Sequence, residues 1–298
     1  MPLCSFDQLF QQADVRRQPV TVAVAGGADR TVLEALRTAC DRGWAAPLVA
    51  GRDADIRHLA SECSLSLRGF TILGTNDPAA ASVAQVRCGQ AAMLMKGQIA
   101  TPDLMRAVLD PSSGLRSRHV ICQVVLMQVR QTNRRFLLAD TGICIQPSLE
   151  QKIDILQSAI GVARALGATE PQIAVMSATE KVIQAMPDTL DAAELQRRNQ
   201  AGEFPGCVVH GPLSFDLAYS TEAADKKQLP ATPADVMLFP NLLSANLTVK
   251  AIMYTADCRF GGVLCGAACP VVFMSRADST ETRLHSLALA LALLAAGI

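Results

Sequence analysis

The stretch that decides the fold is Val20-Thr-Val-Ala-Val-Ala-Gly-Gly-Ala-Asp29. Its first six residues are apolar except for Thr21 and rich in valine, which predicts a short buried strand. Gly26, Gly27 and Asp29 then break the strand, and an apolar helical pattern follows, with members at Val32, Leu33, Leu36 and Ala39. A strand, a tight turn and a helix in this order form the first part of a parallel βαβ unit.

The same alternation continues outward from this stretch. Further strands are predicted at 47–50, 70–73, 92–95, 119–129 and 134–139, and a helix begins at Thr101, with Pro102 in its first turn. From about residue 130 a second series follows, with helices at 149–166 and 192–201 and strands at 172–176, 207–209, 236–239, 262–264 and 271–274. The segment 284–298 is predicted to be a buried helix, because it consists mainly of strong helix formers.

This order of elements predicts an α/β fold, a three-layer α/β/α architecture with two lobes and a cleft between them. The chain has 298 residues, and a single hydrophobic core stops growing at roughly 250–300 residues. Charged residues make up only 18% of the chain, below the usual figure of about 25%. We therefore expect part of the surface to be buried against another subunit.

Composition excludes several kinds of partner and site. The 27 basic and 27 acidic residues give zero net charge, so we expect no nucleic acid and no anionic membrane as partner. The apolar segment 284–298 is shorter than the ~20 residues of a membrane span. The ten cysteines are scattered singly in apolar surroundings and no secretory signal precedes them, which predicts reduced thiols and a cytoplasmic location. The four histidines are isolated, so no metal site is expected.

Candidate site residues follow the predicted strands, where ligands of open α/β sheets bind. Lys96 and Gly97 end one strand, and Thr101 and Arg106 lie on the next helix. A cation at this place suits an anion, although a solvated lysine is the plain alternative. Gly26-Gly27 lacks the spacing of a dinucleotide or P-loop motif, and we interpret it as a tight turn.

Three further groups of polar residues follow later strands. Asp216 lies in the turn after His210-Gly-Pro, where it could equally be a helix cap. Asn246 and Lys250 are four residues apart and share one face of a predicted helix. Ser275, Arg276 and Asp278 follow the strand at 271–274. A hydroxyl beside a guanidinium is a plausible receptor for an oxyanion, whereas a cap of the final helix is the plain alternative.

Taken together, these motifs resemble the phosphate acetyl/butyryltransferase family, especially its butyryltransferase branch. The resemblance covers nearly the whole chain in order. It rests on Met95-Lys96-Gly97 with Thr101 and residues 104–109, on Glu180-Lys181-Val182, on His210-Gly-Pro-Leu-Ser-Phe-Asp216, on 234–240 and 246–250, and on Pro270-Val-Val-Phe-Met-Ser-Arg-Ala-Asp-Ser279.

The resemblance implies a reversible acyl transfer, in which acyl-CoA and phosphate give acyl phosphate and free CoA. It implies an isocitrate-dehydrogenase-like architecture with lobes 1–128 plus 265–298 and 129–264, the active site in the interdomain cleft, and a homodimer. CoA and acyl-CoA are substrates, and no tightly bound cofactor is implied. Ser275, Arg276 and Asp278 would be catalytic. Lys96, Gly97, Thr101, Arg106, Asp216, Asn246 and Lys250 would bind substrate.

The chain departs from the family pattern where the acetyltransferase branch carries its proposed base. That acidic position is Thr282 here, and a second arginine of that branch falls near Tyr254, with Arg259 as a substitute. These departures leave the general base unassigned. The lost acidic position, together with His210 where the family has an aspartate before Gly-Pro, motivates an alternative, a catalytically silent CoA-binding regulatory protein of the same fold. A third hypothesis from fold alone, an NADP-linked decarboxylating dehydrogenase, lacks the paired aspartates that a divalent metal would need.

Overall fold

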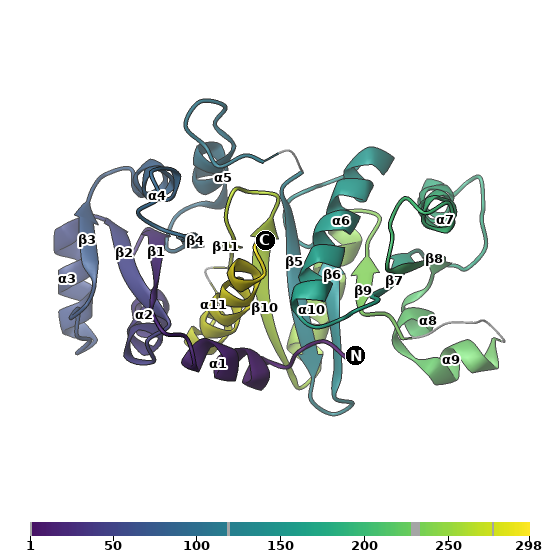
Figure 1. The fold of residues 1–298 in the computed structure, drawn as a ribbon, viewed down its shortest axis with the longest axis horizontal. Coiled ribbons are helices and arrows are strands. Elements are labelled where there is room, and N and C mark those ends of the chain that lie inside the picture. Colours follow the sequence, from purple (N-terminus) through teal and green to yellow (C-terminus); the bar gives the residue numbers. More distant parts are fainter. Residues whose placement is uncertain (1, 118–119, 228–232, 276) are drawn as a thin grey trace. The chain divides into compact units, whose positions relative to one another are not determined.

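The structure is a computed structural model that describes residues 2–117, 120–227, 233–275 and 277–298 (Figure 1). The chain forms two compact units. The first unit comprises Phe6–His119 and Phe260–Ile298, and the second comprises Met1–Ser5 and Val120–Arg259. Each unit combines strands with helices, so the fold is α/β as expected. The lobes 1–128 plus 265–298 and 129–264 stay a prediction.

The first unit has strands in the order β3-β2-β1-β4-β11-β10. Their bounds are β1 Val20–Ala25, β2 Ala45–Gly51, β3 Thr71–Gly74, β4 Met93–Lys96, β10 Cys258–Cys265 (in this unit from Phe260) and β11 Val271–Val272. Strands β3, β2, β1, β4 and β11 pair in parallel, whereas β10 and β11 are antiparallel. The link 266–270 is too short for a crossover helix, which explains this departure from the parallel pairing that the sequence predicted.

The helices of the first unit are α1 Phe6–Asp14, α2 Arg30–Asp41, α3 Asp53–Glu62, α4 Pro78–Arg87, α5 Thr101–Leu109 and α11 Thr280–Ala295. Helix α11 packs on α1, α2 and β11, and every residue from Thr282 to Leu291 is buried. A helix that is apolar on all sides must be covered on all sides, so the prediction of a buried C-terminal helix is confirmed.

The second unit has strands in the order β5-β6-β9-β7-β8. Their bounds are β5 Cys122–Val129, β6 Arg134–Ala139, β7 Gln172–Met176, β8 Val208–Leu213 and β9 Val236–Leu238. Strands β5 and β6 form an antiparallel hairpin, and the other pairs are parallel. The helices are α6 Leu149–Ala165, α7 Pro187–Gln200, α8 Phe215–Tyr219, α9 Thr221–Lys226 and α10 Leu242–Thr255.

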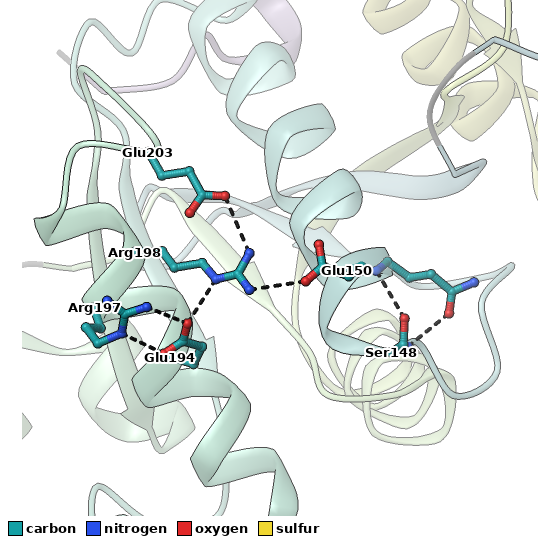
Figure 2. Close-up of polar contacts among 7 residues, drawn as sticks. Ser148, Glu150, Glu194, Arg197, Arg198 and Glu203 are labelled. Atoms are coloured by element: carbon teal, nitrogen blue, oxygen red, sulfur yellow. Dashed lines mark hydrogen bonds and ion pairs between the residues drawn. The ribbon is translucent and has the colours of Figure 1, made fainter.

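Two kinds of ion pair link α6 to α7. Arg198 of α7 contacts Glu194 of its own helix and reaches Glu150 of α6 at 3.1 Å, at a position that remains partly exposed (Figure 2). Lys152 of α6 is buried, and its Nζ lies 2.6 Å from Asp191 of α7. Helix α6 begins with a capping box, in which the side chains of Ser148 and Gln151 each accept the other residue's backbone amide.

No helix in the described ranges of the chain has the length and apolar content that a membrane crossing requires.

Candidate active site

The first unit changes its direction of strand addition at β1. The chain adds β2 and β3 on one side of β1 and then returns to add β4 on the other side. At such a switch point the loops after the strands diverge and leave a crevice at the carboxyl edge. Strand β11 pairs with β4 in parallel, with Val272 opposite Met95. The loop that follows β11 therefore begins at the same edge as Lys96.

Gly97 lets the loops after β1 and β4 touch through their backbones. Its amide donates to Ala25 O at 2.9 Å, and the next amide, of Gln98, donates to Gly26 O at 2.7 Å. A Cβ at position 97 would lie 2.0 Å from Gly26 O, closer than any real Cβ approaches an atom. The amides of Gly26 and Gly27 both donate to Ala50 O, which fits the interpretation of these two glycines as a tight turn.

Lys96 is buried at the carboxyl end of β4. Its side chain is 2% exposed, and Nζ lies 3.4 Å from Gly97 O. Burial rules out the plain alternative of a solvated lysine. Because a buried ammonium needs polar or anionic groups around it, its presence at the ligand-binding edge of the sheet suits an anionic substrate.

Asp278 shapes the loop that carries Ser275. The Ser275 amide donates to Asp278 Oδ2 at 2.6 Å, and the Ala277 amide donates to Ser275 Oγ at 3.4 Å. Ser275 itself is exposed. The final helix is capped by Ser279, which accepts from the Thr282 amide, so Asp278 is left to organise the loop. Arg276 lies outside the described residues.

Thr282, at the position of the related branch's proposed base, is a buried residue in the first turn of α11, and its amide donates to the capping Ser279. It is 7% exposed, and its hydroxyl lies 3.0 Å from Ser279 Oγ. The neighbouring Glu281 points to His285, with 3.6 Å between Oε1 and Nε2. Among the described residues, no group of three His, Cys, Asp or Glu side chains is placed to hold a metal ion.

Two adjoining cavities open beside the switch point. One of about 370 Å³ lies at the carboxyl ends of β1, β2 and β3, where Gly26, Gly27 and Arg52 line it. The other, of about 930 Å³, lies between α4 and α5. Both are lined by Asn76, Pro78 and Ile99.

Two arginines line the larger cavity. Arg106 is the one that the sequence predicted, and its Nη1 lies 3.2 Å from Asp103. The sequence analysis missed Arg87, at the end of α4, because no motif contains it. It lines the cavity only because α4 packs on α5. Thr101, the first residue of α5, is exposed and lies outside the lining of both cavities.

The other three predicted residues belong to the second unit. Asp216 accepts from Ser214 Oγ at 2.5 Å and lies 3.4 Å from Lys227 Nζ, and these contacts, the Ser214 hydrogen bond first, lower the pKa of its carboxyl group. Asn246 donates to Thr141 O at 3.2 Å, so it holds a loop in place. Lys250 is exposed on α10.

A buried carboxylate in the second unit was missed. Asp140 is 4% exposed, and its oxygens accept the amides of Gln123 at 2.9 Å, Gly142 at 2.9 Å and Cys144 at 2.6 Å. The sequence signal was available, because an aspartate followed by Thr-Gly after an apolar strand is typical of a side chain that organises its own turn.

A mainly apolar cavity of about 610 Å³ lies at the carboxyl ends of β7 and β9 in the second unit. Met176, Phe215, Phe239 and Ile252 supply apolar walls, and a hydrogen bond of 2.6 Å joins Ser177 to Asp188 at its polar side. Such a lining suits an apolar ligand group with a polar neighbour.

The chain is similar to known acyl-transferring enzymes along nearly its whole length. Residues 73–291 match the family described as Phosphate acetyl/butaryl transferase. The chain is 37% identical to the phosphate butyryltransferase of Clostridium acetobutylicum, over 96% of this chain and 97% of that one. It is 36% identical to the phosphate acetyltransferase of Thermotoga maritima, over 90% and 93%. A crystal structure of a branched-chain phosphotransacylase from Enterococcus faecalis is 29% identical, with a TM-score of 0.81, over 92% and 99%.

Proposed function

The chain belongs to the phosphate acetyl/butaryl transferase family, and from this premise we infer that it is an acyltransferase that moves an acyl group reversibly between CoA and phosphate. The observation that carries this conclusion is the nearly full-length similarity to two transferases whose names differ only in the acyl group. Phosphate is common to both names.

For the reaction centre we propose the edge formed by Lys96 and the loop at 275–278. In the forward direction a phosphate oxygen attacks the thioester carbonyl, the carbon–sulfur bond breaks, and the CoA sulfur leaves as a thiolate that takes up the proton given up by the phosphate. The Ser275 hydroxyl would donate to the phosphate or to the developing oxyanion, where a fixed donor contributes most. Arg276 and Lys96 would hold the phosphate, and Asp278 would hold the Ser275 amide, as its 2.6 Å contact suggests.

For CoA we propose the two adjoining cavities of the first unit. Arg87 and Arg106 line the larger cavity, and guanidinium groups grip phosphate with paired hydrogen bonds. The smaller cavity adds Arg52 beside the glycine turn. An extended molecule with several phosphate groups suits two cavities that share a wall.

In the second unit, the apolar cavity around Phe215, Phe239 and Ile252 supports a role in holding an apolar part of the substrate. Asp216 is the neighbour of Phe215 in sequence, and its role in binding substrate stays a prediction, as does that of Lys250. Asn246 would act through the Thr141 loop that it holds.

The reaction is tested by following free thiol as acetyl-, propionyl- or butyryl-CoA is mixed with phosphate. We expect thiol release that requires phosphate, and the relative rates define the preferred acyl chain. Ser275→Ala and Arg276→Ala should lower kcat/KM by on the order of 100-fold or more. A chain that binds CoA in calorimetry but turns over none of the three thioesters would instead be the silent regulatory protein.

Three finer features remain proposals. Exposed apolar side chains on α10, namely Leu243, Leu247 and Tyr254, favour a homodimer through this helix. Ten free thiols favour a reducing compartment such as the cytoplasm. The two-lobed, three-layer, isocitrate-dehydrogenase-like arrangement stays a prediction from the resemblance.

A further inference from the structure

Among the described residues of the first unit, Arg283 is the largest charged side chain that is buried. It lies in the first turns of α11 and is 1% exposed. Burial lowers the pKa of its guanidinium, while Asp29 and Asp278 act in the opposite direction. An arginine nevertheless stays charged in proteins. A buried cation is costly unless hydrogen bonds and opposite charges surround it, so its surroundings indicate its role.

Those surroundings connect two loops at the carboxyl edge of the sheet. Arg283 Nε donates to Thr31 Oγ1 at 2.8 Å, and that hydroxyl donates to Asp29 Oδ1 at 2.6 Å. Asp29 is the N-cap of α2 and accepts the Val32 amide at 3.0 Å. The turn after β1 is thereby fixed to the guanidinium.

The other end of the guanidinium faces the Ser275 loop. Nη2 lies 3.4 Å from Ser275 O and 4.0 Å from Asp29 Oδ1. The amide of the same serine is held by Asp278, so both backbone groups of Ser275 have a partner. A second tie joins the same elements, because Thr280 Oγ1 donates to Glu34 Oε2 of α2 at 2.6 Å.

We propose that Arg283 is a positioning residue for the acyl transfer, which fixes the Ser275 backbone against the turn after β1 through Thr31 and Asp29. The proposal rests on the proposed role of Ser275. Arg283 is too deeply buried to contact substrate, so it acts by holding the hydroxyl of Ser275 where phosphate binds. Displacement of a catalytic group by about 1 Å can cost on the order of 100-fold in rate.

The test measures kcat and the KM values for phosphate and for acyl-CoA in Arg283→Met, Arg283→Lys and Thr31→Val. We expect Arg283→Met to lower kcat/KM for phosphate by on the order of 100-fold, with the KM for acyl-CoA changed by less than about twofold. Thr31→Val should cause a smaller loss of about tenfold, because it removes the hydroxyl that links Arg283 to Asp29 but keeps the guanidinium itself. Arg283→Lys should recover part of the activity, because it keeps the charge.

Lys152→Met is the matched control, because Lys152 is an equally buried cation with a carboxylate partner elsewhere in the chain. It should lower the melting temperature and leave the ratio of the two KM values unchanged. If Arg283→Met does not fold, Thr31→Val decides, since it keeps the shape of the side chain.

Wild-type kinetics in a folded Arg283→Met or Thr31→Val, or an equal rise of both KM values, would overturn the proposal. Ser275→Ala is assayed beside them. If that variant is fully active, the assigned site itself is wrong, whereas an inactive Ser275→Ala with active Arg283→Met refutes only the positioning role.

Discussion

Gly97 matters because it has no side chain. The sequence analysis predicted Lys96-Gly97 as part of an anion site because of the positive charge of Lys96. A glycine is needed at position 97 for a different reason: the close contact with the Gly26 backbone leaves no space for a Cβ. Gly26 and Gly97 are far apart in sequence, so no local pattern could indicate that position 97 requires a glycine.

Gly97→Ala should therefore displace the loop after β4. The clash with Gly26 O involves backbone, so we expect a loss of about 1–3 kcal/mol in the free energy of unfolding. We also expect kcat/KM to fall on the order of 100-fold. Denaturant unfolding and the thiol-release assay measure both effects. Gly74→Ala is the control, because its nearest neighbour would be at an ordinary 3.9 Å, and it should change little.

His210 should make the stability of the chain depend on pH. It is half-buried on β8, and burial lowers the pKa of its imidazole. In the unfolded chain the ring takes up a proton near pH ~6.5, whereas the folded chain takes it up only at lower pH. Below about pH 6.5 the unfolded state thus binds more protons, and the free energy of unfolding falls as the pH is lowered.

His210→Gln should remove this contribution. The difference in unfolding free energy between variant and wild type should shift in favour of the variant between about pH 7.5 and pH 5.5. The quantity to compare is the slope of the unfolding free energy against pH, because the substitution also has an effect that does not depend on pH. One histidine changes this slope by the equivalent of at most about one bound proton. Parallel pH profiles for wild type and His210→Gln would contradict the expectation.

At the scale of elements, strand ends indicated where polar residues leave the sheet, whereas the partners of these residues could not be predicted. Ser275 and Lys96 follow neighbouring strands, as strand-end logic suggested. Asn246 instead holds Thr141 O, and Asp216 is bound to Ser214 and Lys227. Sequence shows which polar residues leave a strand or share a helix face, but the chain packing decides whether each meets a ligand or a neighbouring loop.

The two ion pairs between α6 and α7 should differ strongly in their effect on stability. Lys152→Met leaves Asp191, whose side chain is 30% exposed, without its partner and should cost about 1–3 kcal/mol of unfolding free energy. Arg198→Ala removes pairs that water already screens, and exposed pairs contribute little. Urea unfolding of both variants measures the difference. An Arg198→Ala as unstable as Lys152→Met would show that burial is not what sets the strength of these pairs.

For the whole molecule, the alternation of strands and helices was enough to predict an α/β fold. It could not predict that β5–β6 and β10–β11 pair antiparallel, because a strand's apolar pattern does not reveal its partner's direction. The sequence analysis also missed helix α1. This helix packs on α11, where the rings of Phe6 and His285 stack with 4.2 Å between their centroids. Segments distant in sequence thus complete the first unit.

The low charge of the chain and the exposed apolar side chains of α10 lead to the last prediction. Leu243, Leu247 and Tyr254 are 70%, 61% and 80% exposed, and they recur at helical spacing on one face. If this face is the dimer contact, Leu247→Glu places a charge in an apolar interface and should give a monomer in light scattering after gel filtration. Val15→Glu is the matched control, because Val15 is also 80% exposed but lies in a different unit. A Leu247→Glu chain that keeps the mass of the wild type would show that α10 is not the contact, and a monomeric wild type would refute the dimer altogether.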